Sequence, residues 1–348
     1  MLTPHPHVDI VIPNFNGVQF LATCLRSLVK QTYPSFSIIV VDNGSVDKSL
    51  EFVREHYPLV HLISWQQNKG FSPAVNAGIS AGNSPFVFLL NNDTELEEDC
   101  LEQLVKVALL QDEYDFFAAK MISYHDRHLL DGAGDGFLRG GVGYRLGTME
   151  NDDVRYSRPG RVFGACAGAA LYRRALFDAI GLFDEDFFAY LEDVDFNLRA
   201  NSRAKKCYYV PAARVFHIGS ATTGSKINSF TVRLSTRNNL YLLVKNYPLA
   251  LFFRFGFTLL VYQFFWFVFV VKKKQFTAYV SGVVEFVGNL PLMLKKRREV
   301  LAGVTLTTDE LAEIIVAAER DVICSIMNRR QAQGKTNRLL SLYTRWLL

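Results

Sequence analysis

Short apolar runs alternate with apolar residues at helical spacing along the first third of the chain. The runs end in polar or turn residues and cover 8–13, 37–42, 59–63 and 85–90. Between the runs, apolar positions recur every three or four residues and predict helices around 20–28, 46–56, 72–81 and 97–111. Strands and helices that alternate with short connections predict a parallel sheet with helices on both faces.

The middle of the chain has a less regular pattern. Residues 164–174 and 206–210 predict two further strands, and 184–200 form an acidic, aromatic segment that turns helical. Residues Asp131–Gly147 are crowded with glycine and have no periodicity, which predicts a long mobile loop. Asp131–Gly136 lacks the acid spacing and the closing glutamate of a calcium-binding loop.

The pattern changes again after about residue 235. Residues 249–271 are almost wholly apolar, and 276–294 carry a single charged residue. Thr307 and Glu310 have the spacing of a capping box at the start of a further amphipathic helix. The last residues form a basic amphipathic segment, so the C-terminal part of the chain is predicted to be helical.

Composition and charge point to a membrane surface. The chain has 348 residues, of which 49% are hydrophobic, and its mean hydropathy of +0.10 is high for a fully soluble enzyme. A net charge of +4 gives no reason to expect a nucleic-acid partner, but positive charge is clustered at Lys272–Lys274 and Lys295–Arg298. Basic clusters beside apolar segments favour anionic lipid head groups.

The cysteines and the N-terminus are consistent with a reducing cytosol. The chain has 5 cysteines, an odd number, and no Cys-x-x-Cys motif, which argues against a disulfide framework and a zinc site. Residues 1–7 have neither the basic nor the apolar region of a cleavable signal peptide.

Two acidic residues follow buried strands at the carboxyl edge of the predicted sheet, where open α/β folds bind ligands. Asp42 suits the N3–H of a uracil or thymine ring, or a ribose hydroxyl. Asp93 suits a divalent cation that bridges two phosphates. Each residue also fits an ordinary turn or helix cap, and the pattern alone leaves both interpretations open.

Three acids, Glu192, Asp193 and Asp195, come directly after an aromatic segment. A carboxylate among aromatic rings loses solvation, which raises its pKa toward that of a general base. Acids that simply stabilise a helix N-terminus are the alternative. His217 lies just beyond a strand and suits manganese or a phosphate, although a lone histidine is also common as a structural residue.

The order of these motifs resembles that of family-2 glycosyltransferases, in particular the rhamnosyltransferase-like branch. The matching segments lie within about residues 8–246 and are Val11–Gly17, Val41–Ser45, Asn68–Gly78, Leu90–Thr94, Gly181–Asp195 and His217–Ser220. The resemblance implies a GT-A fold, a Rossmann-like mixed α/β sheet flanked by helices. It implies a catalytic domain over 1–246, with a nucleotide half near 1–120 and an acceptor half near 121–246, followed by a helical membrane-associated region over 247–348.

The resemblance also implies roles for individual residues. Asp193 is the expected base, with Glu192 beside it contacting the acceptor, and Asp93 and His217 are expected to serve a Mn2+ or Mg2+ ion and the diphosphate. We further expect Arg199 to pair with the neighbouring acids. The expected nucleotide-binding residues are Pro13, Asn14, Asn16, Asp42, Asn43, Asn68, Gly70 and Asn92.

The chain departs from the family pattern at the metal-binding strand. Many relatives carry Asp-x-Asp there, whereas the first position in this chain is Asn91. Asparagine does not supply a full negative charge, so we expect weaker metal affinity, although its carbonyl oxygen remains a suitable ligand.

The implied activity is inverting transfer of a sugar from a UDP- or dTDP-sugar to a glycan or polyprenyl-linked acceptor in cell-surface polysaccharide assembly, with rhamnose favoured by the branch. Two other hypotheses are a sugar nucleotidyltransferase and a catalytically inactive scaffold. A nucleotidyltransferase needs a basic, glycine-rich loop after the first strand, but Pro13–Gly17 has no Lys or Arg. Loss of Asp93 or Asp193 would favour the scaffold, and both are present.

The apolar segments favour a position at the cytoplasmic face of the inner membrane, peripheral or interfacial. Phe255–Val271 is short for a span, and extending it to Leu249 would bury Arg254. A single span from a cytosolic domain would place Lys272–Lys274 on the far side, against the positive-inside tendency. Helices that lie in the interface avoid both problems. True spans, a dimer interface and a buried core remain alternatives, and the oligomeric state is open.

Overall fold

The structure is a computed structural model that describes residues 5–219 and 227–347, and the chain divides into two compact units. Unit 1 comprises Met1–Asp135, Arg145–Phe188 and Lys205–Thr222. Unit 2 comprises Gly136–Tyr144, Ala189–Ala204 and Thr223–Leu348. Ser220, in the last of the sequence motifs, lies outside the described residues.

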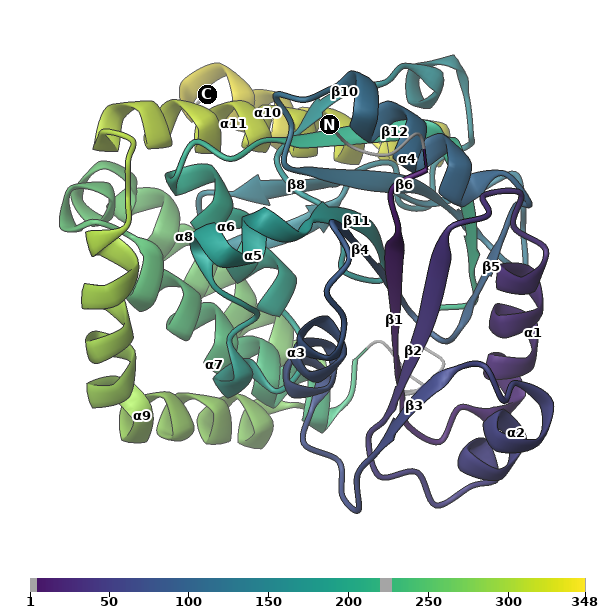
Figure 1. Cartoon of the computed structure of the whole chain (residues 1–348). Coiled ribbons are helices and arrows are strands. Elements are labelled where there is room, and N and C mark those ends of the chain that lie inside the picture. Colours follow the sequence, from purple (N-terminus) through teal and green to yellow (C-terminus); the bar gives the residue numbers. More distant parts are fainter. Residues whose placement is uncertain (1–4, 220–226, 348) are drawn as a thin grey trace. The chain divides into compact units, whose positions relative to one another are not determined.

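A ten-stranded mixed sheet forms the centre of unit 1 (Figure 1). Its main path runs β10-β12-β6-β11-β4-β1-β2-β3, with β5 paired to β12 and β7 paired to β6. β1 pairs in parallel with β2 and β4, whereas β11 is antiparallel to β4 and β6. The strands are β1 (Val8–Asn14), β2 (Phe36–Asp42), β3 (His61–Ser64), β4 (Phe86–Leu90), β5 (Thr94–Leu96), β6 (Phe116–Ser123), β7 (Leu130–Ala133), β10 (Gly160–Val162), β11 (Ala169–Arg173) and β12 (Cys207–His217).

Helices cover both faces of this sheet, as the strand–helix alternation predicts. Ile10 and Ile12 of β1 belong to the same buried cluster as Leu25 of α1 and Leu104 of α4. Val11 points to the opposite face because successive strand residues alternate, and there it meets α3 at Gly78. The helices of unit 1 are α1 (Val18–Val29), α2 (Ser49–His56), α3 (Phe71–Ala81), α4 (Cys100–Leu110) and α5 (Arg174–Ile180).

The prediction of a long mobile loop over Asp131–Gly147 is wrong. This segment contains the end of β7 and the hairpin of β8 (Asp135–Leu138) and β9 (Val142–Arg145). The strands were not predicted because glycines interrupt the alternating pattern of the sequence. Glycines are needed there for left-handed turns, as at Gly141 with φ 80°. The hairpin is held from outside by Asn239, whose Nδ2 donates to the carbonyl oxygens of Gly140 (3.1 Å) and Gly141 (2.9 Å). A contact between residues so far apart leaves no periodic signal in the sequence.

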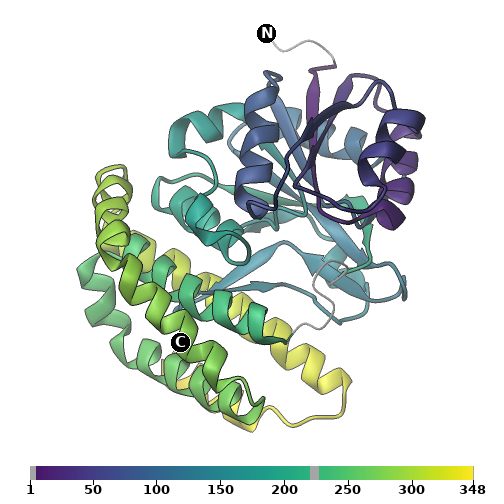
Figure 2. The ribbon, with the colours of Figure 1, turned by 90° about the horizontal axis from the view of Figure 1, so that it is seen from below.

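Unit 2 is a helical assembly that also holds the β8–β9 hairpin (Figure 2). Thr307 and Glu310 form the predicted capping box, with Thr307 N donating to Glu310 Oε2 at 2.8 Å. α6 and the hairpin, which we expected in the catalytic domain, group with the C-terminal helices. The domain division at residue 246 stays a prediction. The helices are α6 (Glu192–Ser202), α7 (Ser229–Asn246), α8 (Leu249–Lys272), α9 (Phe276–Ala302), α10 (Thr308–Ala332) and α11 (Arg338–Leu347).

Two helices of unit 2 are long and apolar enough to cross a membrane. By length and composition, α8 and α9 are the two such helices among the described residues. Only 22% of the apolar window of α8 and 17% of that of α9 is buried, so neither is an ordinary core helix.

Candidate functional site

Three polar side chains meet at the carboxyl edge of the sheet, at the ends of β1, β2 and β4. Asn14 and Asp42 lie opposite each other in the register of β1 and β2, directly after Pro13 and Val41. Asn14 Nδ2 donates to Asp42 Oδ2 at 2.8 Å, and Asn92 Nδ2 donates to Asn14 Oδ1 at 2.7 Å. The three side chains are almost fully buried and form one hydrogen-bonded row at the edge where open α/β sheets bind ligands.

The loop after β2 is tied to the loop after β1. Ser45 N donates to Asp42 Oδ1 at 2.9 Å, and the Ser45 hydroxyl accepts from the Asn16 backbone N–H at 2.9 Å. Asn16 Oδ1 in turn accepts from Val46 N at 2.8 Å. Asn16 itself has a positive φ of 51°. These reciprocal bonds hold two adjacent strand ends in a single rigid turn.

A second loop joins this edge through Asn43. Its Nδ2 donates to Asn68 Oδ1 at 3.0 Å and to the Gly70 carbonyl at 2.8 Å, and Gly70 N donates to Asn68 Oδ1 at 2.8 Å. Gly70 has φ 100°, and a Cβ there would lie 2.6 Å from the Phe188 carbonyl oxygen. Only glycine fits this position without strain. The expected nucleotide-binding residues of unit 1 are thus brought together in the structure.

Asp93 and His217 also come together, at the β5–β12 pair. His217 lies opposite Thr94 in the register, and its Nε2 is 3.4 Å from Asp93 Oδ1. Its Nδ1 lies 2.8 Å from Asp131 Oδ2. Arg145 forms an ion pair with the same Asp131 carboxylate. Two carboxylates therefore bracket a nearly buried imidazole.

The two carboxylates decide the protonation of His217. Burial of the ring lowers the pKa of His217, but the hydrogen bonds to Asp131 and Asp93 outweigh it, so the pKa lies above its ordinary value. Because Asp131 occupies Nδ1, the ring presents Nε2 toward Asp93.

The donor set fits a hard divalent cation in part. Carboxylate oxygen from Asp93 and imidazole nitrogen from His217 suit Mn2+ or Mg2+, which often keep further positions for phosphate and water. Within 5–219 and 227–347 no group of three or more His, Cys, Asp or Glu side chains is arranged to hold a metal ion. The backbone carbonyl oxygen of Asn91 accepts from Thr94 Oγ1 at 2.6 Å, which leaves the side-chain oxygen of Asn91 out of this bond.

The expected catalytic acids open helix α6 in unit 2. Glu192 is buried and Asp193 is half-buried. Burial, and then the negative charges of Asp193 and Asp195, raise the pKa of Glu192 to about 8. Its Oε2 has no hydrogen-bond partner among the described residues. Glu192 is therefore protonated near neutral pH, beside a more accessible carboxylate.

Strained backbone precedes these acids. Phe188, Tyr190 and Leu191 have φ of 63°, 68° and 66°, and none is glycine. Asn238 of α7, which is fully buried, donates from Nδ2 to the carbonyl oxygens of Ala189 (2.9 Å) and Tyr190 (2.7 Å). This amide therefore contributes to holding the turn that precedes Glu192 and Asp193.

A buried ion network holds the rest of α6. Asp195 accepts from Arg199 Nε (2.9 Å), Lys245 Nζ (2.7 Å) and Asn246 Nδ2 (2.8 Å). Asp195 is fully buried, and such a carboxylate is stable only when several donors surround it. Arg199 pairs with one of the neighbouring acids, and that acid is Asp195.

Sequence reasoning missed three residues of this arrangement. Asp131 was assigned to a mobile loop, yet it orients His217. Asn238 and Lys245 lie in a helix whose polar residues look solvent-facing, but both side chains are buried. The unusual density of Asn in α7 was the available signal, because asparagine is a weak helix former that needs a structural reason.

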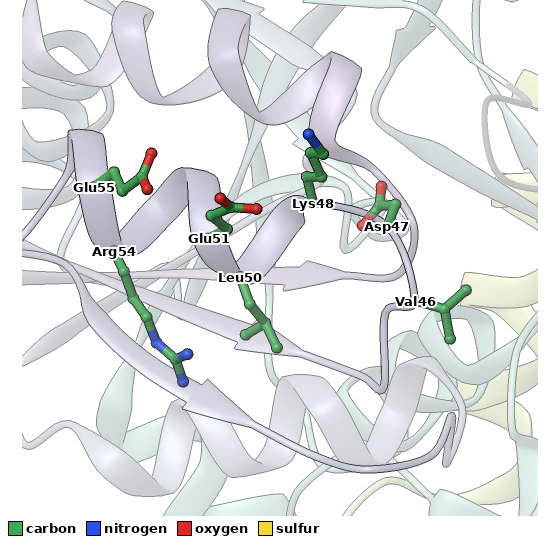
Figure 3. Close-up of a pocket in the computed structure, with 7 residues that line it drawn as sticks. All are labelled: Val46, Asp47, Lys48, Leu50, Glu51, Arg54 and Glu55. Atoms are coloured by element: carbon green, nitrogen blue, oxygen red, sulfur yellow. The ribbon is translucent and has the colours of Figure 1, made fainter.

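A surface pocket lies beside α2 and contains none of the expected site residues in its lining, although Val46 of the lining donates to Asn16. Its volume is about 450 Å3, and Figure 3 shows the side chains that line it. They are Val46, Asp47, Lys48, Leu50, Glu51, Arg54 and Glu55. None of them was expected to take part in sugar transfer, and no role is assigned to the pocket.

Residues 9–181 match the family model described as Glycosyl transferase family 2. An N-acetylglucosaminyl-diphospho-decaprenol L-rhamnosyltransferase of Mycobacterium tuberculosis is 28% identical over 239 residues, which cover 62% of this chain and 78% of that protein. Glycosyltransferase GlyA of Streptococcus pneumoniae is 34% identical over 101 residues. That match covers 28% of this chain and only 14% of GlyA.

One solved structure resembles almost the whole chain. It is the mannosyltransferase PcManGT from Pyrobaculum calidifontis in complex with GDP-Man and Mn2+, with a TM-score of 0.51 and 14% identity. The likeness covers 99% of this chain and 88% of that one. At this identity it shows the fold alone, a GT-A mixed sheet with flanking helices.

Proposed function

The chain belongs to glycosyl transferase family 2, and on that premise we propose that it transfers a sugar, with inversion, from a nucleoside-diphosphate sugar to a hydroxyl group. The observation that carries the proposal is the row of Asn14, Asp42 and Asn92 at the ends of three adjacent strands. The donor is a UDP- or dTDP-sugar, because a strand-end carboxylate suits the N3–H of uracil and thymine alike.

Asp193 is the base in this proposal. The acceptor oxygen attacks the anomeric carbon while its proton passes to the Asp193 carboxylate. The bond from the anomeric carbon to the diphosphate oxygen breaks, and the diphosphate leaves with the bonding electrons. Half-burial keeps Asp193 accessible, and we assign to Glu192, whose pKa burial raises to about 8, the role of donating a hydrogen bond to the acceptor.

Asp93 and His217 would hold a divalent cation, Mn2+ or Mg2+, between them and the diphosphate. Bound there, such a cation neutralises charge on the leaving group. The Mn2+ in the complex of the mannosyltransferase that shares the fold supports this choice. Asp131 and Arg145 act behind His217 and keep its ring in one orientation.

The acceptor is a lipid-linked glycan at the cytoplasmic face of the membrane. The similar rhamnosyltransferase of Mycobacterium tuberculosis supports this proposal, because its name specifies a decaprenol-linked acceptor. The sparsely buried apolar helices α8 and α9 support a position at a membrane. Rhamnose is the sugar that this relative favours, in the assembly of a cell-surface polysaccharide.

A donor-binding experiment tests the nucleotide site. UDP-, dTDP- and GDP-sugars are added with and without Mn2+, and the melting temperature is measured, since a ligand that binds only the native state must raise it. We expect a rise with a UDP- or dTDP-sugar that Asp42→Ala abolishes. Asp115→Ala, which removes a carboxylate paired with Lys205 before β6, is the matched control and keeps the rise. Equal shifts in both variants would contradict the assignment of Asp42.

A further inference from the structure

We propose that α8 and α9 lie in the plane of an anionic membrane surface, with their exposed faces among the acyl chains, and that neither helix crosses the bilayer. The proposal rests on the proposed function only in that a lipid-linked acceptor places the chain at a membrane. Its physical basis is the structure of unit 2 alone.

The outer face of each helix carries an apolar stripe. Seven exposed apolar residues of α8 follow a spacing of three and four, which keeps them on one side, beside the exposed Arg254: Leu249, Phe253, Phe257, Leu260, Phe264, Phe267 and Val271. In α9 the stripe is Phe276, Val280, Val284 and Val287. Phe253 is 87% exposed and Leu260 is 72% exposed. Stripes of this length are too large and too aromatic for an ordinary soluble surface.

The inner face of α8 is anchored by polar contacts to α7. Gln263 Nε2 donates to Asn239 Oδ1 at 2.7 Å, and Trp266 Nε1 donates to Thr236 Oγ1 at 3.0 Å. These bonds lie on the side of α8 that also buries Leu259 and Val270. α8 therefore has one face on protein and an apolar face that is exposed.

The inner face of α9 is anchored to the same helix by charges. Glu285 accepts from Arg233 Nη1 at 2.7 Å and from Arg237 Nη1 at 3.2 Å. Asn289 Nδ2 donates to the Tyr241 hydroxyl at 2.8 Å, and Arg297 Nη1 donates to the Val244 carbonyl at 2.6 Å. These anchors run from Glu285 to Arg297 of α9, so α9 and α7 lie side by side.

This packing argues against a span. If α8 or α9 crossed the bilayer while keeping its anchors, α7 would enter the hydrocarbon with Arg233, Arg237 and Lys245. Charged side chains in the hydrocarbon region are strongly unfavourable. Helices that lie in the membrane interface keep their apolar stripes in lipid and leave α7 on the aqueous side.

Charge selects an anionic lipid surface as the occupant of this face. Lys272 ends α8, Lys273 and Lys274 follow it in the turn, and all three are exposed. Lys295 and Arg298 are exposed on α9. Basic residues directly beside an apolar stripe match the head groups that border acyl chains. A second copy of this chain carries the same positive charges, which repel across a self-interface.

Vesicle binding tests the surface with the full-length chain. Co-sedimentation is measured with vesicles of phosphatidylcholine alone and with vesicles that contain phosphatidylglycerol. The variant Phe253→Ser/Phe257→Ser/Phe264→Ser should bind anionic vesicles less tightly by on the order of a hundredfold. Lys272→Glu/Lys273→Glu/Lys274→Glu should lose at least about tenfold and remove the preference for phosphatidylglycerol.

The matched control changes equally exposed apolar residues of unit 1. Leu59→Ser/Leu110→Ser/Val154→Ser replaces side chains that are 99%, 70% and 74% exposed and should bind vesicles as the unchanged chain does. Equal loss in the control, or no loss in the phenylalanine variant, would overturn the proposal. If the unchanged chain sediments as a dimer and the phenylalanine variant sediments as a monomer, with unchanged vesicle binding, the exposed face is a self-interface instead.

Topology is tested in membrane vesicles of defined orientation. In a Cys324→Ser background, the Lys273→Cys variant places a thiol at the turn between α8 and α9. We expect a membrane-impermeant maleimide to label it in vesicles whose cytoplasmic face is outward, and not in sealed vesicles of opposite orientation. Labelling from the opposite side alone would show a spanning hairpin.

Different measurements test the proposed sugar transfer and the proposed membrane binding by α8 and α9. The phenylalanine variant should keep the nucleotide-sugar rise in melting temperature, because no residue of α8 belongs to the candidate nucleotide site. If vesicle binding changes as proposed but the chain binds no nucleotide sugar, the membrane-binding face of α8 and α9 is supported and the proposed transferase function is contradicted.

Discussion

Asn14, Asp42 and Asn92 illustrate how side chains at strand ends form a site. Each follows or closes a strand whose apolar residues are buried, and parallel pairing brings the three strand ends to one edge. The sequence predicted that they meet because the carboxyl ends of parallel strands share an edge, and their role in nucleotide binding stays a prediction. Asp131 could not be predicted in the same way, since its partner His217 is far away in the chain and its strand is short.

Because of Glu192, the free energy of unfolding should depend on pH. In the unfolded chain its carboxyl ionises near 4.5, but in the folded chain burial keeps it protonated until about pH 8. The stability that the neutral form contributes is complete below pH 4.5 and is lost between there and about pH 8, at about 1.4 kcal/mol per pH unit. Glu192→Gln should flatten this decline in urea unfolding at pH 5 and 8.5. Glu313→Gln, at an exposed position, should leave it unchanged, and an equal decline in the two variants would refute the buried state of Glu192.

Gly70 is the residue whose replacement should affect the loop most. Alanine would bring a Cβ to 2.6 Å from the Phe188 carbonyl oxygen at φ 100°, which costs about 1–3 kcal/mol of stability and displaces Asn68. We expect Gly70→Ala to lower the melting temperature and to weaken nucleotide-sugar binding in calorimetry. Gly256→Ala, in a helix with open space around it, should be neutral or stabilising. Unchanged binding by Gly70→Ala would mean that the loop does not contact the donor.

α7 is the element on which unit 2 depends. Lys245 and Asn246 bond to Asp195 of α6, and Asn238 bonds to the turn that precedes α6. Other positions of α7 hold α8 and α9. Its polar residues are buried on more than one face, so it lacks the apolar stripe by which sequence analysis recognises a helix that packs. The strands β1–β4 and the helices α1–α4 were predictable because each has a clear periodicity. The three-residue strand β5 was missed because it is too short to show one, and the β8–β9 hairpin was missed because a distant asparagine holds it.

Asn238 is a positioning residue for the acids of α6. Asn238→Ala removes both hydrogen bonds to the strained segment, so Asp193 should be displaced and kcat should fall by about tenfold to a hundredfold. The dissociation constant of the donor should not change, because the nucleotide-binding residues lie in unit 1. Asn289→Ala, which also removes a bond to α7 but far along α9, should keep kcat. A rise in the donor dissociation constant with unchanged kcat would contradict this role.

The whole molecule combines a family-2 sheet unit with a helical unit that is mostly outside the matched region. The family match ends at residue 181, before α6 begins, so the acids of α6 rest on the sequence motif and on their environment rather than on that match. Asp42 and Asp93 belong to unit 1, and Asp193 belongs to unit 2. The proposed roles of Asp42 and Asp93 in donor binding and of Asp193 in proton transfer are therefore tested by separate measurements.

The most direct test is sugar transfer by the Asp193→Asn variant, with a UDP- or dTDP-sugar and a polyprenyl-diphosphate acceptor. The unchanged chain should form a product whose anomeric configuration, measured by NMR, is opposite to that of the donor. Asp193→Asn should bind the donor with the same rise in melting temperature but transfer it about a hundredfold to ten-thousandfold more slowly. Normal transfer by that variant, or a product that keeps the donor's configuration, would contradict the account.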